Sequence, residues 1–180
     1  MNELTNSAPS TSASPNIHVA GRIAKISGTI SAVGVVFFIG LYALYWTPFK
    51  ELGLTFGLIN DICVTIQYLL TIPIALALYR ILVVHNPALI RITTAVGLVG
   101  MVSTVGLQLL LIFGMLTFEQ QFLWITLAMI LGVGSWLVIT GLVARSTGRM
   151  PNSVLMSVLA IPYFGYPLWA FWLGRRLSVW

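Results

Sequence analysis

Five long stretches without a charged residue divide the chain, and each is long enough to cross a lipid bilayer. They hold 18 to 27 residues, while a helix of about 20 apolar residues spans a hydrocarbon layer of about 30 Å. We therefore predict an all-α membrane protein, a bundle of five transmembrane helices. The uncharged stretches are residues 26–49, 62–79, 92–118, 120–144 and 150–174, and the helices are placed at about 26–46, 58–82, 92–118, 122–144 and 153–173.

Composition supports this class of protein. Hydrophobic residues make up 58% of the chain and charged residues only 7%, against about 25% charged residues in a soluble domain. This excludes a water-soluble monomer and assigns residues 26–176 to the membrane domain. Residues 1–25 are mainly polar, so we expect a disordered N-terminal tail, because such a segment buries too little apolar surface to offset the entropy of ordering.

The distribution of basic residues predicts the orientation of the bundle. With five helices, six basic residues lie on the side of the N-terminus and three on the other side. The positive-inside rule then favours a cytoplasmic N-terminus in the inner membrane of the cell. The basic residues are too scattered to bind nucleic acid, and membrane lipids are the expected partners. The six are Arg22, Lys25, Arg80, Arg91, Arg145 and Arg149, and the three are Lys50, Arg175 and Arg176.

Prolines and small residues interrupt the predicted helices. Pro73 lies in the second helix, and Pro162 and Pro167 lie in the fifth. Each should kink its helix, either as a tolerated irregularity or to open a cavity near the middle of the bilayer. Small residues at helical spacing predict close contacts between helices, within one chain or in a homo-oligomer. They are Gly28 and Ala32, then Gly97, Gly100, Ser103 and Gly106, then Ala128 and Gly132.

Asp61 is the one acidic residue that falls within a predicted helix. If the second helix begins near Leu58, Asp61 lies in its first turn, where the helix dipole favours an anion, and we favour this interpretation. If the helix begins near Leu54, Asp61 lies about 10 Å inside it. Thr65 and Tyr68 would then share its face at positions i+4 and i+7, and this polar stripe would be a functional site.

Further polar and aromatic residues reach a similar depth in other predicted helices. Gln108 lies in the third helix, Trp136 in the fourth, and Tyr163 and Tyr166 in the fifth. Together with Asp61 they suggest a mostly apolar pocket with a few converging polar groups, which is typical of a small-ligand site. The simpler interpretation, which we favour, is that Gln108 and the tyrosines form hydrogen bonds between helices and hold the bundle together.

Familiar catalytic and metal-binding patterns are missing. His18 lies in the tail and His85 in a loop, and neither forms a catalytic group with a serine. One cysteine, two separated histidines and four carboxylates predict no metal site, and no cofactor motif is present. We therefore expect an accessory or structural protein, or one that binds a small ligand, on its own or with other membrane subunits. The alternatives are a small transporter or channel that uses Asp61, and an enzyme acting on a lipid or another hydrophobic substrate.

Two segments carry a resemblance to a known group. Residues 77–82 (ALYRIL) precede Asn86-Pro87 and a glycine-rich helix, and residues 148–151 (GRMP) open the last helix, which ends PLWAFWLGR. Over about residues 79–176 the chain resembles a family of bacterial multi-pass membrane proteins of unknown function. The resemblance implies a membrane bundle and no particular activity.

Overall fold

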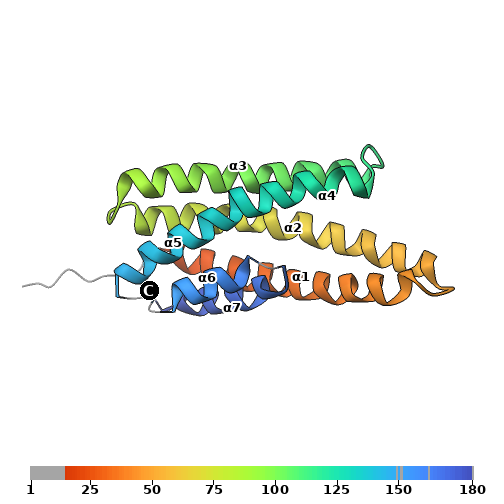
Figure 1. The fold of residues 1–180 in the computed structure, drawn as a ribbon. Helices are drawn as coiled ribbons and strands as arrows, with labels where there is room; N and C mark the ends of the chain where they lie inside the picture. The colour runs from red at the N-terminus through yellow and green to blue at the C-terminus, as the bar shows by residue number, and fades with distance from the viewer. Residues whose placement is uncertain (1–14, 149, 151, 162, 180) are drawn as a thin grey trace, which may run out of the picture.

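The computed structural model describes residues 15–148, 150, 152–161 and 163–179, and in this part of the chain every regular element is a helix (Figure 1). Three long helices are followed by a fourth that contains a π-helical segment, η1, and then by two short helices joined by a 3-10 turn, η2. The elements are α1 (Pro15–Tyr45), α2 (Lys50–Leu82), α3 (Pro87–Ile112), α4 (Phe118–Leu127), η1 (Ala128–Gly134), α5 (Ser135–Ser146), α6 (Ser153–Ala160), η2 (Tyr163–Gly165) and α7 (Tyr166–Leu177).

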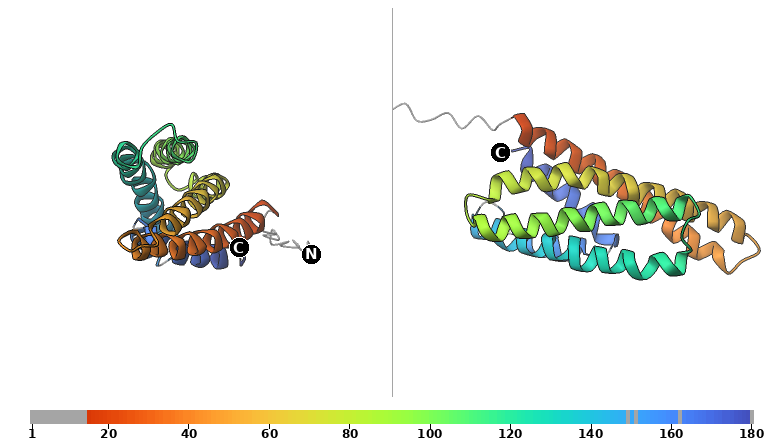
Figure 2. Two further views of the ribbon diagram at one scale, coloured as in Figure 1. Left: turned by 90° about the vertical axis from the view of Figure 1, so that its right-hand side faces the viewer. Right: turned by 90° about the horizontal axis from the view of Figure 1, so that it is seen from above.

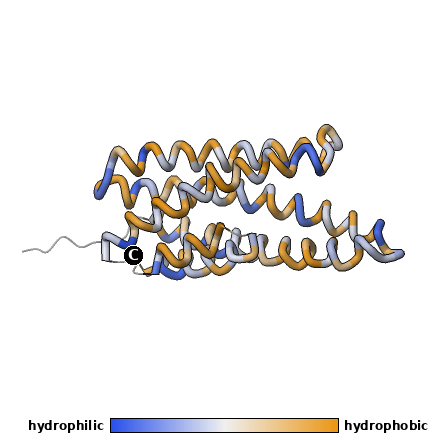
Figure 3. Tube along the Cα trace, viewed as in Figure 1, coloured by the Kyte–Doolittle hydropathy of each residue, from blue (hydrophilic) through white to orange (hydrophobic). Residues whose placement is uncertain are grey.

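Four helices are long and apolar enough to cross a membrane. They are Ile17–Tyr45, Lys50–Leu82, Pro87–Ile112 and Phe118–Ser146, the last being α4, η1 and α5 in one continuous helix. Colouring by hydropathy places most hydrophilic residues towards the two ends of these helices (Figure 3). The prediction of a helical membrane protein is therefore supported, with four candidate spans among the described residues instead of the five predicted.

The predicted fifth helix, at about 153–173, is wrong as a single span. The chain forms α6 and α7 there, which are 8 and 12 residues long, or about 12 and 18 Å. Neither length crosses the hydrocarbon layer. α6 ends at Ala160, and α7 begins at Tyr166 with Pro167 in its first turn. Proline removes a backbone donor and clashes with the preceding turn of a helix, so Pro167 starts a new helix instead of kinking one, while Pro162 lies outside the described residues.

α6 and α7 form a re-entrant hairpin that enters the bundle and returns to the same end. Along α5, Gly141 faces Ser157 and Gly134 faces Ile161, so α6 runs antiparallel to α5. Along α1, Gly34 faces Tyr163 and Gly21 faces Gly174, so α7 runs back along α1.

At the end of the hairpin, the ammonium group of Lys25 donates a hydrogen bond of 3.2 Å to the hydroxyl of Ser178. The start of α1 and the end of α7 therefore lie side by side, as both views in Figure 2 show.

The first two helices begin earlier than predicted. α1 starts at Pro15, not at residue 26, so residues 15–25 are helical and the expected tail is wrong for this segment. The physical reason is packing: Ala20 and Ala24 are buried, and the neighbouring Gly21 faces the end of α7. Residues 1–14 lie outside the described residues. α2 starts at Lys50 instead of residue 58 and continues through Pro73.

Small residues bring α3 against the fourth span. A Cβ atom on Gly100 would lie 2.8 Å from the Cα of Gly132, and one on Gly97 would lie 2.6 Å from the Trp136 side chain. These contacts confirm the predicted close approach at Gly97, Gly100 and Gly132. The extension of this face to Ser103 and Gly106 is wrong, because both are exposed and Gly106 has open space around it. The stripe predicted at every third residue drifts around a helix of 3.6 residues per turn.

At the end opposite the re-entrant hairpin, the helices separate into two pairs. The ribbons of α1 and α2 diverge there from those of α3 and α4 (Figures 1 and 2). α4 packs on α3, and α1 packs on α2. The hairpin of α6 and α7 thus fills one half of the bundle, and its turn lies near the level where the two pairs begin to separate.

Candidate functional site

Asp61 lies deep within α2. It is the twelfth residue of that helix, about 16 Å along the axis from Lys50. The first-turn interpretation is therefore wrong, because α2 begins eight residues before Leu58. Asn60 and Cys63, its neighbours in sequence, both face Gly34 of α1, which is also where Tyr163 approaches. The carboxylate is thus at the level of the re-entrant turn.

Polar side chains converge on Asp61 from both sides. From the hairpin, the Tyr163 hydroxyl donates to Asn60 Oδ1 at 2.7 Å, and Asn60 Nδ2 donates to Asp61 Oδ1 at 3.5 Å. From the other helix pair, Gln121 Nε2 donates to Gln108 Oε1 at 2.8 Å, and the Gln108 side chain lies close enough to Asp61 to act on its carboxylate electrostatically. We call Asn60, Asp61, Gln108, Gln121 and Tyr163 the Asp61 cluster. It joins α2, α3, α4 and η2.

The donors in this cluster leave the carboxylate without a charged partner. In the described part of the chain no lysine, arginine or histidine pairs with Asp61. Its side chain is half-buried, whereas Asn60, Gln108 and Gln121 are buried. Amide hydrogen bonds orient and partly stabilise a carboxylate, but its charge still needs compensation in an apolar medium. The arrangement therefore offers one negative charge to a ligand.

A second polar group lies further along the hairpin. The Tyr166 hydroxyl is 2.8 Å from Ser27 Oγ in α1 and 2.5 Å from Thr71 Oγ1 in α2. Ser27 and Thr71 also donate to the backbone carbonyl of Gln67, at 3.4 and 2.7 Å. We call Ser27, Thr71 and Tyr166 the Tyr166 cluster. All three side chains are buried, so the cluster fixes α7 between α1 and α2.

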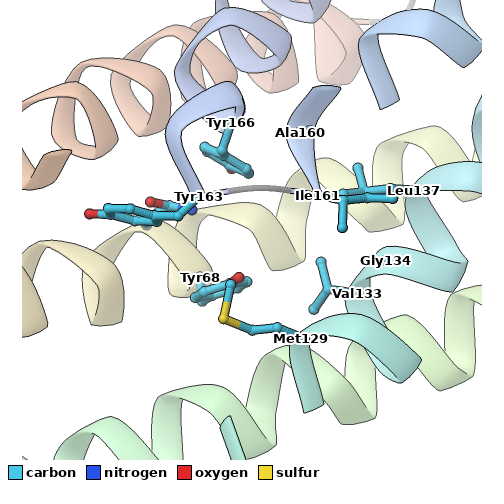
Figure 4. A pocket seen from close by; sticks show the side chains of 10 residues that line it. Tyr68, Met129, Val133, Gly134, Leu137, Ala160, Ile161, Tyr163 and Tyr166 are labelled. Atoms are coloured by element: carbon cyan, nitrogen blue, oxygen red, sulfur yellow. The ribbon is translucent and has the colours of Figure 1, made fainter. Parts of the chain in front are cut away.

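A small cavity lies between the two clusters. Tyr68, Tyr163 and Tyr166 line one side of it, and aliphatic side chains of η1, α5 and α6 line the other (Figure 4). π-Helical segments often mark functional positions in long helices, and η1 faces this cavity. The complete lining is Gln67, Tyr68, Met129, Val133, Gly134, Leu137, Ala160, Ile161, Tyr163 and Tyr166.

The residues predicted from sequence fall into three places. Asp61, Gln108 and Tyr163 come together in one cluster, and Tyr166 and Tyr68 line the neighbouring cavity. Thr65 is turned to its own helix, where its hydroxyl donates to the Asp61 carbonyl at 2.8 Å. Trp136 is fully buried against Gly97 and Trp169, away from the Asp61 cluster, with no partner for its indole nitrogen within the described residues.

Three polar residues of this region were missed by the sequence analysis. Asn60 and Gln67 flank the predicted stripe on α2, and Gln121 lies in the first turn of α4. Amides inside an apolar helix were themselves a signal, since they are costly there unless a partner satisfies them. The sequence signal for Gln121 was weaker, because its position beside Glu119 and Gln120 is typical of a solvated helix start.

Comparison with known proteins assigns no relative: no family model matches the chain, no curated protein matches it, and no solved structure matches it. This is consistent with the resemblance to membrane proteins of unknown function, which implies no activity. The functional argument therefore depends on the site alone.

Proposed function

We propose that this protein is a non-enzymatic membrane protein that binds a small monovalent cation at Asp61. The observation that carries the proposal is a carboxylate deep in α2 that lies among uncharged amide and hydroxyl groups and lacks a charged partner in the described residues. An ionisable residue in a membrane helix is costly unless it is paired or hydrated, which makes such a residue a functional candidate. A cation of charge +1 matches the single carboxylate.

The donor set favours this ligand over a multivalent metal ion. Calcium takes six to eight oxygen ligands, commonly with several carboxylates, and zinc takes nitrogen and sulfur ligands. Within the described residues, no three His, Cys, Asp or Glu side chains form a metal-binding group. Asp61 contributes one charge, and the same cluster holds the oxygens of Asn60, Gln108 and Tyr163, of which Asn60 Oδ1 and Gln108 Oε1 accept hydrogen bonds from Tyr163 and Gln121.

We place the protein in the inner membrane with both ends of the membrane domain in the cytoplasm. The re-entrant hairpin supports this orientation, because it brings Arg175 and Arg176 to the end where α1 begins. Seven of the eight basic residues within the described ranges then lie at that end, and Lys50 lies at the other. The positive-inside rule strongly favours the seven on the cytoplasmic side. They are Arg22, Lys25, Arg80, Arg91, Arg145, Arg175 and Arg176.

Salt-dependent thermal unfolding of the purified protein in detergent tests the proposed ligand. A cation that binds only the folded state stabilises it by an amount that grows with the logarithm of one plus its concentration over its dissociation constant, and so raises the melting temperature. We expect sodium, potassium or methylammonium chloride to raise the melting temperature above that in N-methylglucamine chloride at the same ionic strength. Asp61→Asn should abolish this difference.

The matched control is Glu119→Gln, which removes a carboxylate in the first turn of α4, outside the Asp61 cluster. This variant should keep the cation dependence of the wild type. The proposal fails if Asp61→Asn retains that dependence, or if the wild type unfolds at the same temperature in all four salts.

Transport of the same cation is the second candidate function. The observation that favours it is the interruption of the helices between α6 and α7 at the level of Asp61. Transporters bind their ions near the middle of the bilayer, where helices are discontinuous. Uptake of radioactive sodium or methylammonium into proteoliposomes tests it: flux should require Asp61, and normal flux in a folded Asp61→Asn variant would eliminate this candidate.

A further inference from the structure

The cavity beside the re-entrant turn is of the size of one water molecule. Its volume is about 10 Å³, which is room for a single water molecule. A cavity of this size stays empty when its walls are apolar, and it holds an ordered water when two to four polar groups face it. The polarity of the lining therefore decides the occupant.

Two polar side chains at this cavity have no hydrogen-bond partner within the described residues. Gln67 is 1% exposed, and its Oε1 atom is buried and unpaired. Tyr68 is 3% exposed, and no hydrogen bond from a described residue reaches its hydroxyl. Both residues line the cavity. Burying the Gln67 acceptor unpaired is unfavourable, and a water that donates to it and bonds with the Tyr68 hydroxyl satisfies both groups.

The position of the cavity adds a third reason for an ordered water. It lies against Ala160 and Ile161, where α6 ends, and against Tyr163, where the chain turns. Backbone groups released at a helix break inside a bilayer must be satisfied locally, and ordered water is one of the ways in which membrane proteins do so. The same water would lie between Tyr163 of the Asp61 cluster and Tyr166 of the Tyr166 cluster.

We infer that this cavity is a binding site for one structural water molecule, held by the Gln67 side-chain oxygen and the Tyr68 hydroxyl beneath the re-entrant turn. The water supports the turn from inside the bundle, and it is separate from the cation proposed at Asp61. A failure of either proposal leaves the other in place, because the two sites share no ligand atom.

A structure of the full chain in detergent or nanodiscs, at a resolution that shows ordered water, is the direct test. Density for a single water within hydrogen-bond distance of Gln67 Oε1 and Tyr68 Oη is the expected result. An empty cavity, or density for a larger molecule, overturns the inference.

The sign of a stability change gives an independent test. With water bound, Tyr68→Phe removes one of its partners, and we expect the melting temperature to fall by about 2–4 °C. With a dry cavity, the same change removes an unsatisfied hydroxyl, so the melting temperature would stay the same or rise, which contradicts the inference. Tyr79→Phe is the control, because Tyr79 is half-buried on the same helix but does not line the cavity. It should leave the melting temperature unchanged.

Discussion

At the scale of single residues, Asn60 connects the re-entrant hairpin to the carboxylate of Asp61. Its side-chain oxygen accepts from Tyr163 and its nitrogen donates to Asp61. One side chain thus orients both partners, and among the described residues the hydrogen bond from Tyr163 is the only side-chain hydrogen bond from η2 to α2. The cluster should therefore respond measurably to the loss of one hydroxyl.

Tyr163→Phe removes the donor of that hydrogen bond. We expect the free energy of unfolding to fall by about 1 kcal/mol, with a larger loss if Asn60 Oδ1 remains unpaired. Thermal or denaturant unfolding in detergent measures the change. Tyr42→Phe is the control, since Tyr42 is exposed on α1 and its hydroxyl has no hydrogen bond within the described residues. Equal effects of the two substitutions would contradict the structural role of Tyr163.

The sequence analysis identified several residues of the Asp61 cluster correctly but predicted their roles less well. Asp61 was singled out because charge is rare in apolar helices, and Gln108 and Tyr163 because they reached a similar depth. The start of α2 was misplaced, because Lys50 and Glu51 looked like a loop boundary although they form the first turn. Because of that error, Asp61 was predicted to lie in the first turn of the helix, although it is the twelfth residue of α2.

At the scale of elements, the turn between α6 and α7 depends on a glycine. A Cβ atom on Gly165 would overlap the backbone carbonyl of Leu159, near the end of α6. Any side chain at this position must therefore push η2 away from α6. The conformational requirement is steric, because the backbone angles of Gly165 are those of an ordinary right-handed residue.

Gly165→Ala should loosen the hairpin while α1 to α5 remain in place. We expect a lower melting temperature and faster proteolysis at the end of α7, which limited digestion followed by mass spectrometry measures. The matched control is Gly106→Ala, since Gly106 is an exposed helical glycine with open space around it. That change should be neutral or stabilising by up to about 1 kcal/mol. A Gly165→Ala variant as stable as the control would contradict the turn geometry.

The contact between α3 and η1 leads to a second prediction, on the close approach of two helices. A Cβ atom on Gly132 would lie 2.6 Å from the Cα of Gly100, which is backbone and has no flexible atom to give way. Gly132→Ala must separate the two helices and should lower the melting temperature by several degrees, since a shift of about 1 kcal/mol corresponds to about 2–4 °C in a chain of this size. An unchanged melting temperature would show that this approach is not required for the fold.

At the scale of the whole molecule, the hairpin of α6 and α7 decides at which end of the bundle α7 ends. The uncharged stretch of residues 150–174 is as long as a true span, so length and hydropathy predicted a fifth crossing. What these measures miss is the effect of Gly165 and Pro167, which lie where one apolar segment divides into two half-length helices. The membrane class was predictable from sequence, because it depends on composition, whereas the number of crossings depends on this local break.

The most direct test of the account is the side of the membrane on which α7 ends. In a Cys63→Ser background, single cysteines replace Val84 between α2 and α3, Met115 between α3 and α4, and Val179 after α7, all exposed. Intact and permeabilised cells are then labelled with a membrane-impermeant maleimide. We predict that Val179→Cys is labelled like Val84→Cys and opposite to Met115→Cys. Labelling of Val179→Cys on the side of Met115→Cys would mean five crossings and would contradict the re-entrant hairpin.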